Sequence, residues 1–342
     1  MFEWLQPHPN LKELTIDGYT GIRLPTWMAR AELVSTLFSN LVELKLSYLK
    51  RCEHLPPLSQ LPSLKRLDIS GMDALRKIEE DGGSMCVSLE EFKLTDMPEL
   101  GEWCVKPTTE SFPHLRLLDI GSCPKLVVQP CIPSSVEDLI ILRNQMLLSA
   151  ESIGGLSKLK KLWIISCGVS SKSGEWGGLQ YLTALESLEI QYCDELNCLP
   201  EGVMYMSSLR TLSLWGNRNL KSLEWGRREP LFTALCSLVI DGSPALTALP
   251  EWVGGLTSLQ FLSLRCCDNL AMLPDLPALQ ELQIKNCPLL ARRCERGRGE
   301  EWPKIAHVPN IIIGVEKEEY TEETSKEFSF PTKSVSQSRM LH

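Results

Sequence analysis

Thirteen cysteines and five histidines are the residues of this 342-residue chain that could do metal, redox or nucleophilic chemistry. An odd number of cysteines in a chain of this length is unlike a small disulfide-stapled scaffold. No C-x-x-C pair occurs. The histidines are spaced neither as metal ligands nor as part of a catalytic triad; they are His8, His54, His114, His307 and His342. We therefore expect reduced thiols and no metal site.

Glycine and serine motifs of nucleotide-binding and hydrolytic sites are absent as well. The chain has no G-x-x-x-x-G-K-[ST] loop, no G-x-S-x-G and no H-E-x-x-H. Gly297 and Gly299 lack the third glycine and the preceding strand of a dinucleotide site. Distant residues can still meet in a folded chain, so motif absence alone excludes no enzyme. We nevertheless predict no catalytic residue and no cofactor, and that the protein is not an enzyme.

The charge and the apolar content of the chain limit the classes of partner that it can bind. The formal net charge of −8 argues against general nucleic-acid binding through phosphate contacts. No run of about 18 apolar residues is present, so we expect no membrane span. The first residues, MFEWLQPHPNLKEL, show neither the basic nor the apolar region of a secretory signal. These features predict a cytoplasmic protein.

The elements that would position any site are set by a repeat. The chain contains 58 leucines, and the pattern L-x-x-L-x-[LI], with Val once in the first position and Phe once in the fourth, recurs at intervals of 20 to 30 residues. Leucine-rich repeats have periods of about 20–29 residues. The twelve units start at Leu11, Leu41, Leu64, Leu89, Leu115, Val136, Leu159, Leu185, Leu209, Leu235, Leu259 and Leu279.

Each unit is typical of a short, half-buried strand. In LESLEI, Leu188 and Ile190 alternate with polar residues, which is the period of a strand with one buried face. Such strands stack into a parallel sheet on the inner side of a curved solenoid. The predicted fold is an α/β-type solenoid: a leucine-rich-repeat horseshoe of about twelve repeats, with a concave parallel β-sheet and an irregular or short-helical convex side.

Five of the cysteines belong to this repeat. Eight positions after the first leucine, the later units carry a small or polar residue: Cys123, Asn144, Cys167, Cys193, Asn217, Ser243, Cys267 and Cys287. The chain leaves the strand here and turns inward, so buried backbone groups need hydrogen-bond partners. Amide and thiol side chains supply them. We interpret these residues as a ladder that joins adjacent coils, with neither metal-binding nor nucleophilic roles.

Three segments are predicted. Residues 1–290 form the solenoid, which we expect to be N-terminally truncated because almost nothing precedes the first unit to cap it. Residues 291–314 form a C-terminal cap, and residues 315–342 form a disordered acidic and Ser-rich tail. Arginines in the cap either bind an acidic or phosphorylated partner or lie on a solvated surface with the interleaved glutamates; we favour the solvated surface. They are Arg292, Arg293, Arg296 and Arg298.

Variable strand positions face away from the core and are the candidate contact surface. Most are charged or polar, but four between the seventh and eleventh units are aromatic: Trp163, Tyr192, Trp215 and Phe261. Large aromatic side chains at such positions are candidate interface anchors. Arg210 and Arg265 lie in the same stretch and could pair with acidic groups of a partner. The alternative, packing under flanking loops, remains open.

The segments LQPHPNLKELTIDGYTGIRLPTWM and CPLLARRCERGRGEEWPKIAHVPNIII flank units of the form LxxLxIxxCxxLxxLP. Together they resemble the C-terminal leucine-rich-repeat region of plant intracellular immune receptors, in the coiled-coil class of NLR (nucleotide-binding, leucine-rich-repeat) disease-resistance proteins. The resemblance covers about residues 1–314. Its most specific part is Cys287-Pro288, Arg293-Cys294, Gly299, Trp302, Ile305-Ala306-His307 and Pro309.

The resemblance implies that the repeats restrain a nucleotide-binding module and recognise a pathogen effector or a guarded host protein. The nucleotide-binding domain of that family is absent from this sequence, so we expect no autonomous signalling. The alternative function is a stand-alone scaffold or adaptor for a signalling or ubiquitin-ligase complex. Either function requires protein partners and no nucleic acid.

Overall fold

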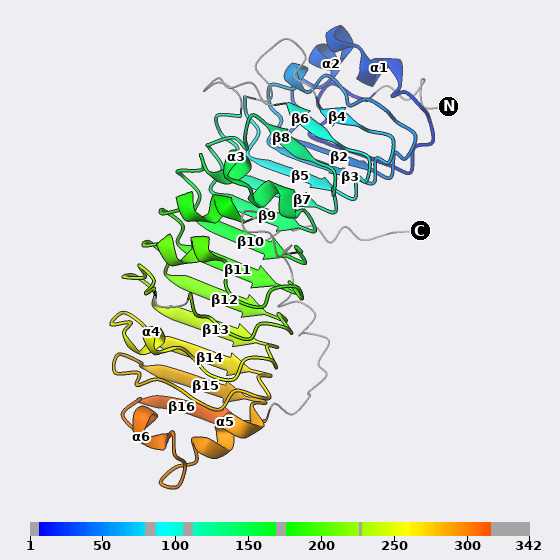
Figure 1. Ribbon diagram of the computed structural model, residues 1–342. Helices are drawn as coiled ribbons and strands as arrows, with labels where there is room; N and C mark the ends of the chain where they lie inside the picture. Colours follow the sequence, from blue (N-terminus) through cyan, green and yellow to red (C-terminus); the bar gives the residue numbers. More distant parts are fainter. Residues whose placement is uncertain (1–6, 79–86, 105–111, 169–175, 226–227, 316–342) are drawn as a thin grey trace.

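A computed structural model describes residues 7–78, 87–104, 112–168, 176–225 and 228–315. Within these residues the chain forms a long, curved stack of parallel strands (Figure 1). The main sheet has thirteen strands in the order β1-β2-β3-β5-β7-β9-β10-β11-β12-β13-β14-β15-β16. Twelve of them coincide with the twelve repeat motifs, which confirms the predicted leucine-rich-repeat horseshoe.

These strands are each five residues long. Their bounds are β1 (Glu13–Asp17), β2 (Glu43–Ser47), β3 (Arg66–Ser70), β5 (Glu91–Thr95), β7 (Leu117–Gly121), β9 (Asp138–Leu142), β10 (Lys161–Ile165), β11 (Ser187–Gln191), β12 (Thr211–Trp215), β13 (Ser237–Asp241), β14 (Phe261–Arg265), β15 (Glu281–Lys285) and β16 (Asn310–Gly314). Each repeat forms one coil of the solenoid.

The core is built from columns of identical repeat positions. The second and fourth residues of each strand point inward, as Leu188 and Ile190 do in β11, where both are fully buried. Leu188 pairs in register with Leu212 of β12, so the column passes from coil to coil without a shift. Burying one such side chain stabilises the fold by about 1.5–3 kcal/mol relative to exposure. The first, third and fifth strand residues face the other way and form the concave face.

A left-handed residue ends every repeat strand. The residue after the strand has a φ between 50° and 66° in all twelve repeats: Gly18, Tyr48, Gly71, Asp96, Ser122, Arg143, Ser166, Tyr192, Gly216, Gly242, Cys266 and Asn286. This conformation turns the chain toward the ladder position. Glycine adopts this conformation freely, whereas it is energetically unfavourable for a residue with a bulky side chain such as Tyr48 or Tyr192.

Short helical turns follow most strands on the convex side, as predicted. They are α1 (Thr26–Ala29), α2 (Ala31–Leu37), η2 (Leu58–Gln60), η3 (Gln145–Leu148), α3 (Ala150–Ile153), η4 (Gly177–Tyr181), η5 (Glu201–Tyr205) and α4 (Glu251–Gly254). None of the helices described is long and apolar enough to span a membrane.

The convex side also carries a second sheet that the repeat pattern did not predict. Its strands are β4 (Lys77–Ile78), β6 (Glu102–Cys104) and β8 (Val127–Gln129), and all are parallel (Figure 1). Ile78, Trp103 and Val128 point into the core from these strands and are buried. Each segment is too short for an alternating pattern to be recognised in the sequence.

Two helices and the last strand close the C-terminal end of the solenoid. They are α5 (Pro288–Arg293), α6 (Trp302–Ile305) and β16, which pairs with β15 along its full length. Leu290, Cys294 and Ile305 are completely buried here and extend the core of the last coil. The predicted tail, from residue 316 onward, lies outside the described residues.

Candidate functional site

The predicted ladder residues join neighbouring coils. In Asn217, the side-chain Nδ2 donates to the carbonyl of Ile190 at 2.9 Å, and Oδ1 accepts from the backbone N–H of Cys193 at 2.9 Å. Asn144 Nδ2 donates to the carbonyl of Cys123 at 2.7 Å. The side chains therefore replace hydrogen bonds that these buried backbone groups would make with water. The ladder interpretation is confirmed for Asn144 and Asn217, whereas the buried Ser243 hydroxyl makes no hydrogen bond to the described residues.

Burial keeps three of the five ladder thiols protonated. Burial raises the pKa of Cys123 to about 12, that of Cys167 to about 11 and that of Cys193 to about 12. A thiol with such a pKa stays protonated at neutral pH, and the thiolate is the nucleophilic and metal-binding form. In the part of the chain that the structure describes, no group of three or more His, Cys, Asp or Glu side chains could hold a metal ion.

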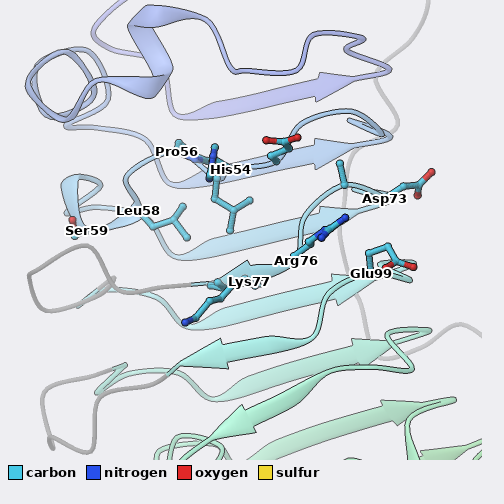
Figure 2. A pocket seen from close by; sticks show the side chains of 12 residues that line it. His54, Pro56, Leu58, Ser59, Asp73, Arg76, Lys77 and Glu99 are labelled. Carbon is cyan, nitrogen blue, oxygen red and sulfur yellow. The ribbon is translucent and has the colours of Figure 1, made fainter.

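A cavity of about 780 Å³ opens between the second and fourth coils (Figure 2). Its lining includes His54, Leu58 and Ser59 on one side and Arg76 and Lys77 on the other. The Ser59 hydroxyl accepts a hydrogen bond from Gln60 Nε2. Both acidic and basic side chains line the cavity.

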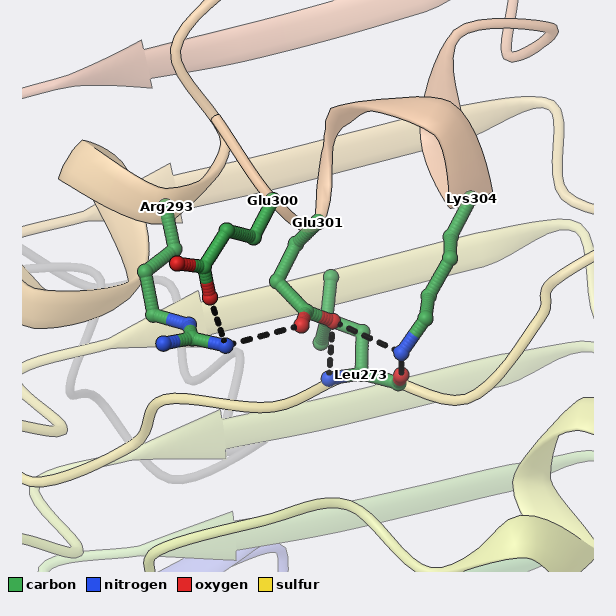
Figure 3. A network of polar contacts seen from close by, with 5 residues as sticks. All are labelled: Leu273, Arg293, Glu300, Glu301 and Lys304. Carbon is green, nitrogen blue, oxygen red and sulfur yellow. Dashed lines mark hydrogen bonds and ion pairs between the residues drawn. The ribbon is translucent and has the colours of Figure 1, made fainter. Parts of the chain in front are cut away.

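The terminal motif is an anchor for the last coil (Figure 3). The carboxylate of Glu301 accepts a hydrogen bond from the backbone N–H of Leu273 at 3.0 Å. Lys304 Nζ lies 2.9 Å from the same carboxylate and donates to the carbonyl of Leu273 at 2.5 Å. Arg293 contacts Glu301 at 3.3 Å and Glu300 at 2.7 Å. His307 Nε2 lies 2.8 Å from the carbonyl oxygen of Leu276.

The expectation of a purely solvated cap surface is wrong for this network. Glu301 is only 4% exposed, because its carboxylate lies against the penultimate coil and accepts a hydrogen bond from the backbone N–H of Leu273. Hydrogen bonds from Leu273, Lys304 and Arg293 outweigh the opposing effect of burial and lower the pKa of Glu301. Arg292, Arg296 and Arg298, in contrast, are exposed.

The six candidate contact residues lie on or beside four of the five adjacent strands from β10 to β14, with none at β13. Trp163 is the central residue of β10, and Trp215 is the last residue of β12. Phe261 and Arg265 are the first and last residues of β14. Arg210 directly precedes β12 and is exposed. The strand register separates the aromatic residues into different rows, so they form no single cluster.

Tyr192 and Trp215 are the pair that the fold does bring together. The backbone N–H of Tyr192 donates to the carbonyl of Trp215 at 2.8 Å. The ring of Tyr192 lies directly beside Gly216, where an added Cβ would be 2.5 Å from the ring atom Cδ1. Tyr192 remains 49% exposed in this position. It therefore packs on the next coil with part of its surface and presents the rest to solvent.

A block of apolar residues around Trp163 was missed by sequence reasoning. In β9 and β10, Ile140 pairs with Trp163 and Leu142 pairs with Ile165, all on the concave face. Ile140 is 2% exposed and Ile165 is 7% exposed, whereas Trp163 and Leu142 are half-buried. The signal was the run of consecutive apolar residues in DLIIL and KLWII, which breaks the alternation that other repeats keep.

Two carboxylates flank this block in the same row. Asp119 of β7 pairs in register with Ile140, and Glu189 of β11 pairs with Trp163. Burial raises the pKa of Asp119 to about 6, with Lys93 opposing the shift and Asp68 adding to it. The carboxylate of Glu189 accepts a hydrogen bond from Gln191 Nε2 at 2.6 Å. The row Asp119–Ile140–Trp163–Glu189 thus combines an apolar centre with two acidic ends.

Comparisons with known proteins agree with the repeat architecture. The family model for R13L1/DRL21 leucine-rich repeats matches residues 1–72. The chain is 33% identical over 319 residues to the putative disease resistance protein RGA1 of Solanum bulbocastanum and 31% identical over 325 residues to RGA4 of the same species. It is 28% identical over 313 residues to the putative disease resistance RPP13-like protein 1 of Arabidopsis thaliana.

These alignments cover most of this chain but a minor part of each relative. They include 92% of the chain for RGA1 and for RGA4, and 86% for the RPP13-like protein. The corresponding shares of the relatives are 29%, 30% and 25%. The chain therefore spans about a quarter to a third of the length of the relatives that it matches.

Proposed function

We propose that this chain recognises proteins during the immune response. Its repeats and its relatives identify it as a leucine-rich-repeat region of a plant NLR disease-resistance protein. The recognised protein is a pathogen effector or a host protein that such an effector modifies. The same region restrains the nucleotide-binding module of its receptor until recognition occurs. The proposed function operates in the cytoplasm, where effectors and receptors of this class meet. It involves no catalysis.

The observation that carries the proposal is the concave face. Thirteen parallel strands present their first, third and fifth residues as one continuous surface across the described repeats. The surface mixes charged rows in the first coils with partly exposed aromatic residues from β10 to β14. An extended surface of this kind complements a protein better than it encloses a small molecule.

We assign the contact role to the six residues placed on or beside β10 to β14: Trp163, Tyr192, Arg210, Trp215, Phe261 and Arg265. Aromatic and arginine side chains supply most of the binding energy in protein interfaces. Trp163, Trp215 and Phe261 are half-buried, so each is held by neighbours and still offers a contact area. A fixed aromatic side chain loses little conformational freedom on binding.

Co-precipitation tests the restraint part of the proposal. The chain is expressed together with, but not joined to, the nucleotide-binding module of a plant receptor of the same class, and the module is recovered on the tagged chain. We expect association in the absence of an effector. A failure to associate with any such module, together with recovery of ubiquitin-ligase or kinase components, would replace the proposal with the adaptor function.

A further inference from the structure

The row Asp119–Ile140–Trp163–Glu189 has a definite length. Its residues lie at the same level of four adjacent strands, β7, β9, β10 and β11. Neighbouring strands are about 4.8 Å apart, so the two carboxylate-bearing positions are roughly 14 Å apart. In an extended peptide, side chains on one side recur every second residue, and positions i and i+4 are separated by about 13–14 Å. An extended segment crossing the strands would therefore place residues i and i+4 at the two ends of the row, with residue i+2 over its centre.

Among the described residues, the acidic ends of the row form no ion pair, although a lysine lies beside one of them. In the described part of the chain, neither Asp119 nor Glu189 lies within ion-pair distance of a basic group. The basic residues at the neighbouring edge of the sheet have other partners: Lys160 lies 3.0 Å and Arg116 lies 3.8 Å from Glu137. Lys161 lies 4.0 Å from Asp138. Lys93 of β5 pairs in register with Asp119 and partly offsets its charge.

The centre of the row is a preformed apolar platform. Ile140 is buried beside Trp163, so the indole is supported from one side and keeps part of its surface in solvent. An apolar partner side chain placed over Trp163 would gain by burying its surface against the indole. Cationic side chains would then meet the carboxylates on either side, where they are attracted and a carboxylate would be repelled.

We propose that this row binds an extended segment of the partner protein that carries Arg or Lys at two positions four residues apart, with an apolar residue midway between them. The proposal rests on the function proposed above and specifies the chemistry of the partner. It assigns Asp119 and Glu189 to partner selection and Trp163 to anchoring. The sequence pattern of the recognised segment is [RK]-x-Φ-x-[RK], where Φ is an apolar residue.

Fluorescence anisotropy with short labelled peptides tests the proposal. The probe is a fluorescein-labelled nonapeptide with Arg at positions 3 and 7, Leu at position 5 and Ser elsewhere. A second peptide replaces both arginines with Glu, and a third places the arginines at positions 3 and 6. We expect binding of the first peptide, about threefold weaker binding of the third, and no measurable binding of the Glu peptide. Added salt should weaken the binding.

Substitutions in the chain test whether the first peptide binds at this row. Glu189→Gln and Asp119→Asn should each weaken binding of the first peptide about threefold. The matched control is Glu281→Gln, because Glu281 is also a concave carboxylate that accepts a hydrogen bond from a glutamine on its own strand, Gln283, at 2.8 Å. This control should leave the affinity unchanged. Far-ultraviolet circular dichroism establishes that each variant is folded.

Several outcomes would overturn the proposal. They are equal affinity for the Arg and Glu peptides, no binding of any peptide at millimolar concentration, or an equal loss on Glu281→Gln and Glu189→Gln. Capture of full-length partner proteins is measured in parallel with a Trp215→Ala, Phe261→Ala variant. If that variant loses its partners while the peptides show no charge preference, the row proposal fails and recognition by the concave face stands.

Discussion

The carboxylate of Glu301 and the backbone N–H of Leu273 form a hydrogen bond of 3.0 Å between residues 28 positions apart in the chain. It connects the cap to the backbone of the penultimate repeat. Within a regular solenoid the next coil would supply such a partner, as the backbone bond between Met272 and Leu249 does one repeat earlier. Glu301 therefore takes the place of a missing coil.

Replacing Glu301 with Ala should destabilise the last coils. The change leaves the Leu273 N–H unsatisfied and removes the ion-pair partner of Lys304, a loss of about 2–3 kcal/mol. Urea unfolding followed by circular dichroism measures it. Glu300→Ala is the control, because the Glu300 side chain is 74% exposed and makes a single ion pair with Arg293. Equal midpoints for the two variants would show that Glu301 is not an anchor.

Asn217→Ala should be more damaging than other asparagine substitutions. It leaves the Cys193 N–H and the Ile190 carbonyl buried without partners, which costs about 2–4 kcal/mol. Asn219→Ala is the matched control, because exposed Asn219 makes one hydrogen bond to the carbonyl of Asp194. Hydrogen exchange at the Cys193 amide reports the local effect. Unchanged protection of this amide in the Asn217 variant would contradict the ladder.

Gly216→Ala should also be destabilising, for two reasons. Gly216 has a φ of 63°, which disfavours a side chain, and an added Cβ would lie 2.5 Å from the Tyr192 ring. We expect a loss of about 1–3 kcal/mol in the free energy of unfolding. Gly155→Ala serves as the control, since nothing lies within 4 Å of its added Cβ. A Gly216 variant as stable as the Gly155 variant would refute the packing of Tyr192.

Asp119 should make the stability depend on pH. Its folded-state pKa is about 6, above the ordinary value of 3.8, so the folded protein holds the proton more tightly than the unfolded chain. The stabilising contribution is present below pH 3.8 and is lost as the pH rises to 6. Asp119→Asn should therefore gain stability relative to the wild type across this window. Chemical unfolding at pH 4, 5, 6 and 7 tests this; a constant difference would contradict the pKa shift.

The repeat and its strands could be predicted from the sequence because the same types of residue recur at the same positions of each coil. Leu188 and its equivalents must be apolar to fill the core, and Cys193 and Asn217 must be small or polar to satisfy the turn. The second sheet could not be predicted, because two or three residues such as Lys77–Ile78 carry too little pattern. Its existence depends on packing between coils.

The anchor and the acidic row were harder to find for a different reason. Glu301 looks like any surface glutamate in GRGEEWPK, and only its position over the last coil makes it buried. Asp119 and Glu189 are 70 positions apart and meet in one row only through the register of four strands. Tyr192 was found from its type, but its packing on Gly216 depends on the left-handed turns of both residues.

A co-precipitation experiment tests directly whether the concave face recognises proteins. The tagged chain and two triple variants are used to recover partners from infected and uninfected leaf tissue. The concave variant carries Trp163→Ala, Trp215→Ala and Phe261→Ala.

The control variant carries three substitutions at side chains that are at least 50% exposed outside the main sheet: Met146→Ala, Leu231→Ala and Met272→Ala. Circular dichroism verifies that both variants are folded. We expect the concave variant to lose the partners that the wild type and the control variant retain. Retention of those partners by the concave variant, with loss in the control variant, would contradict it.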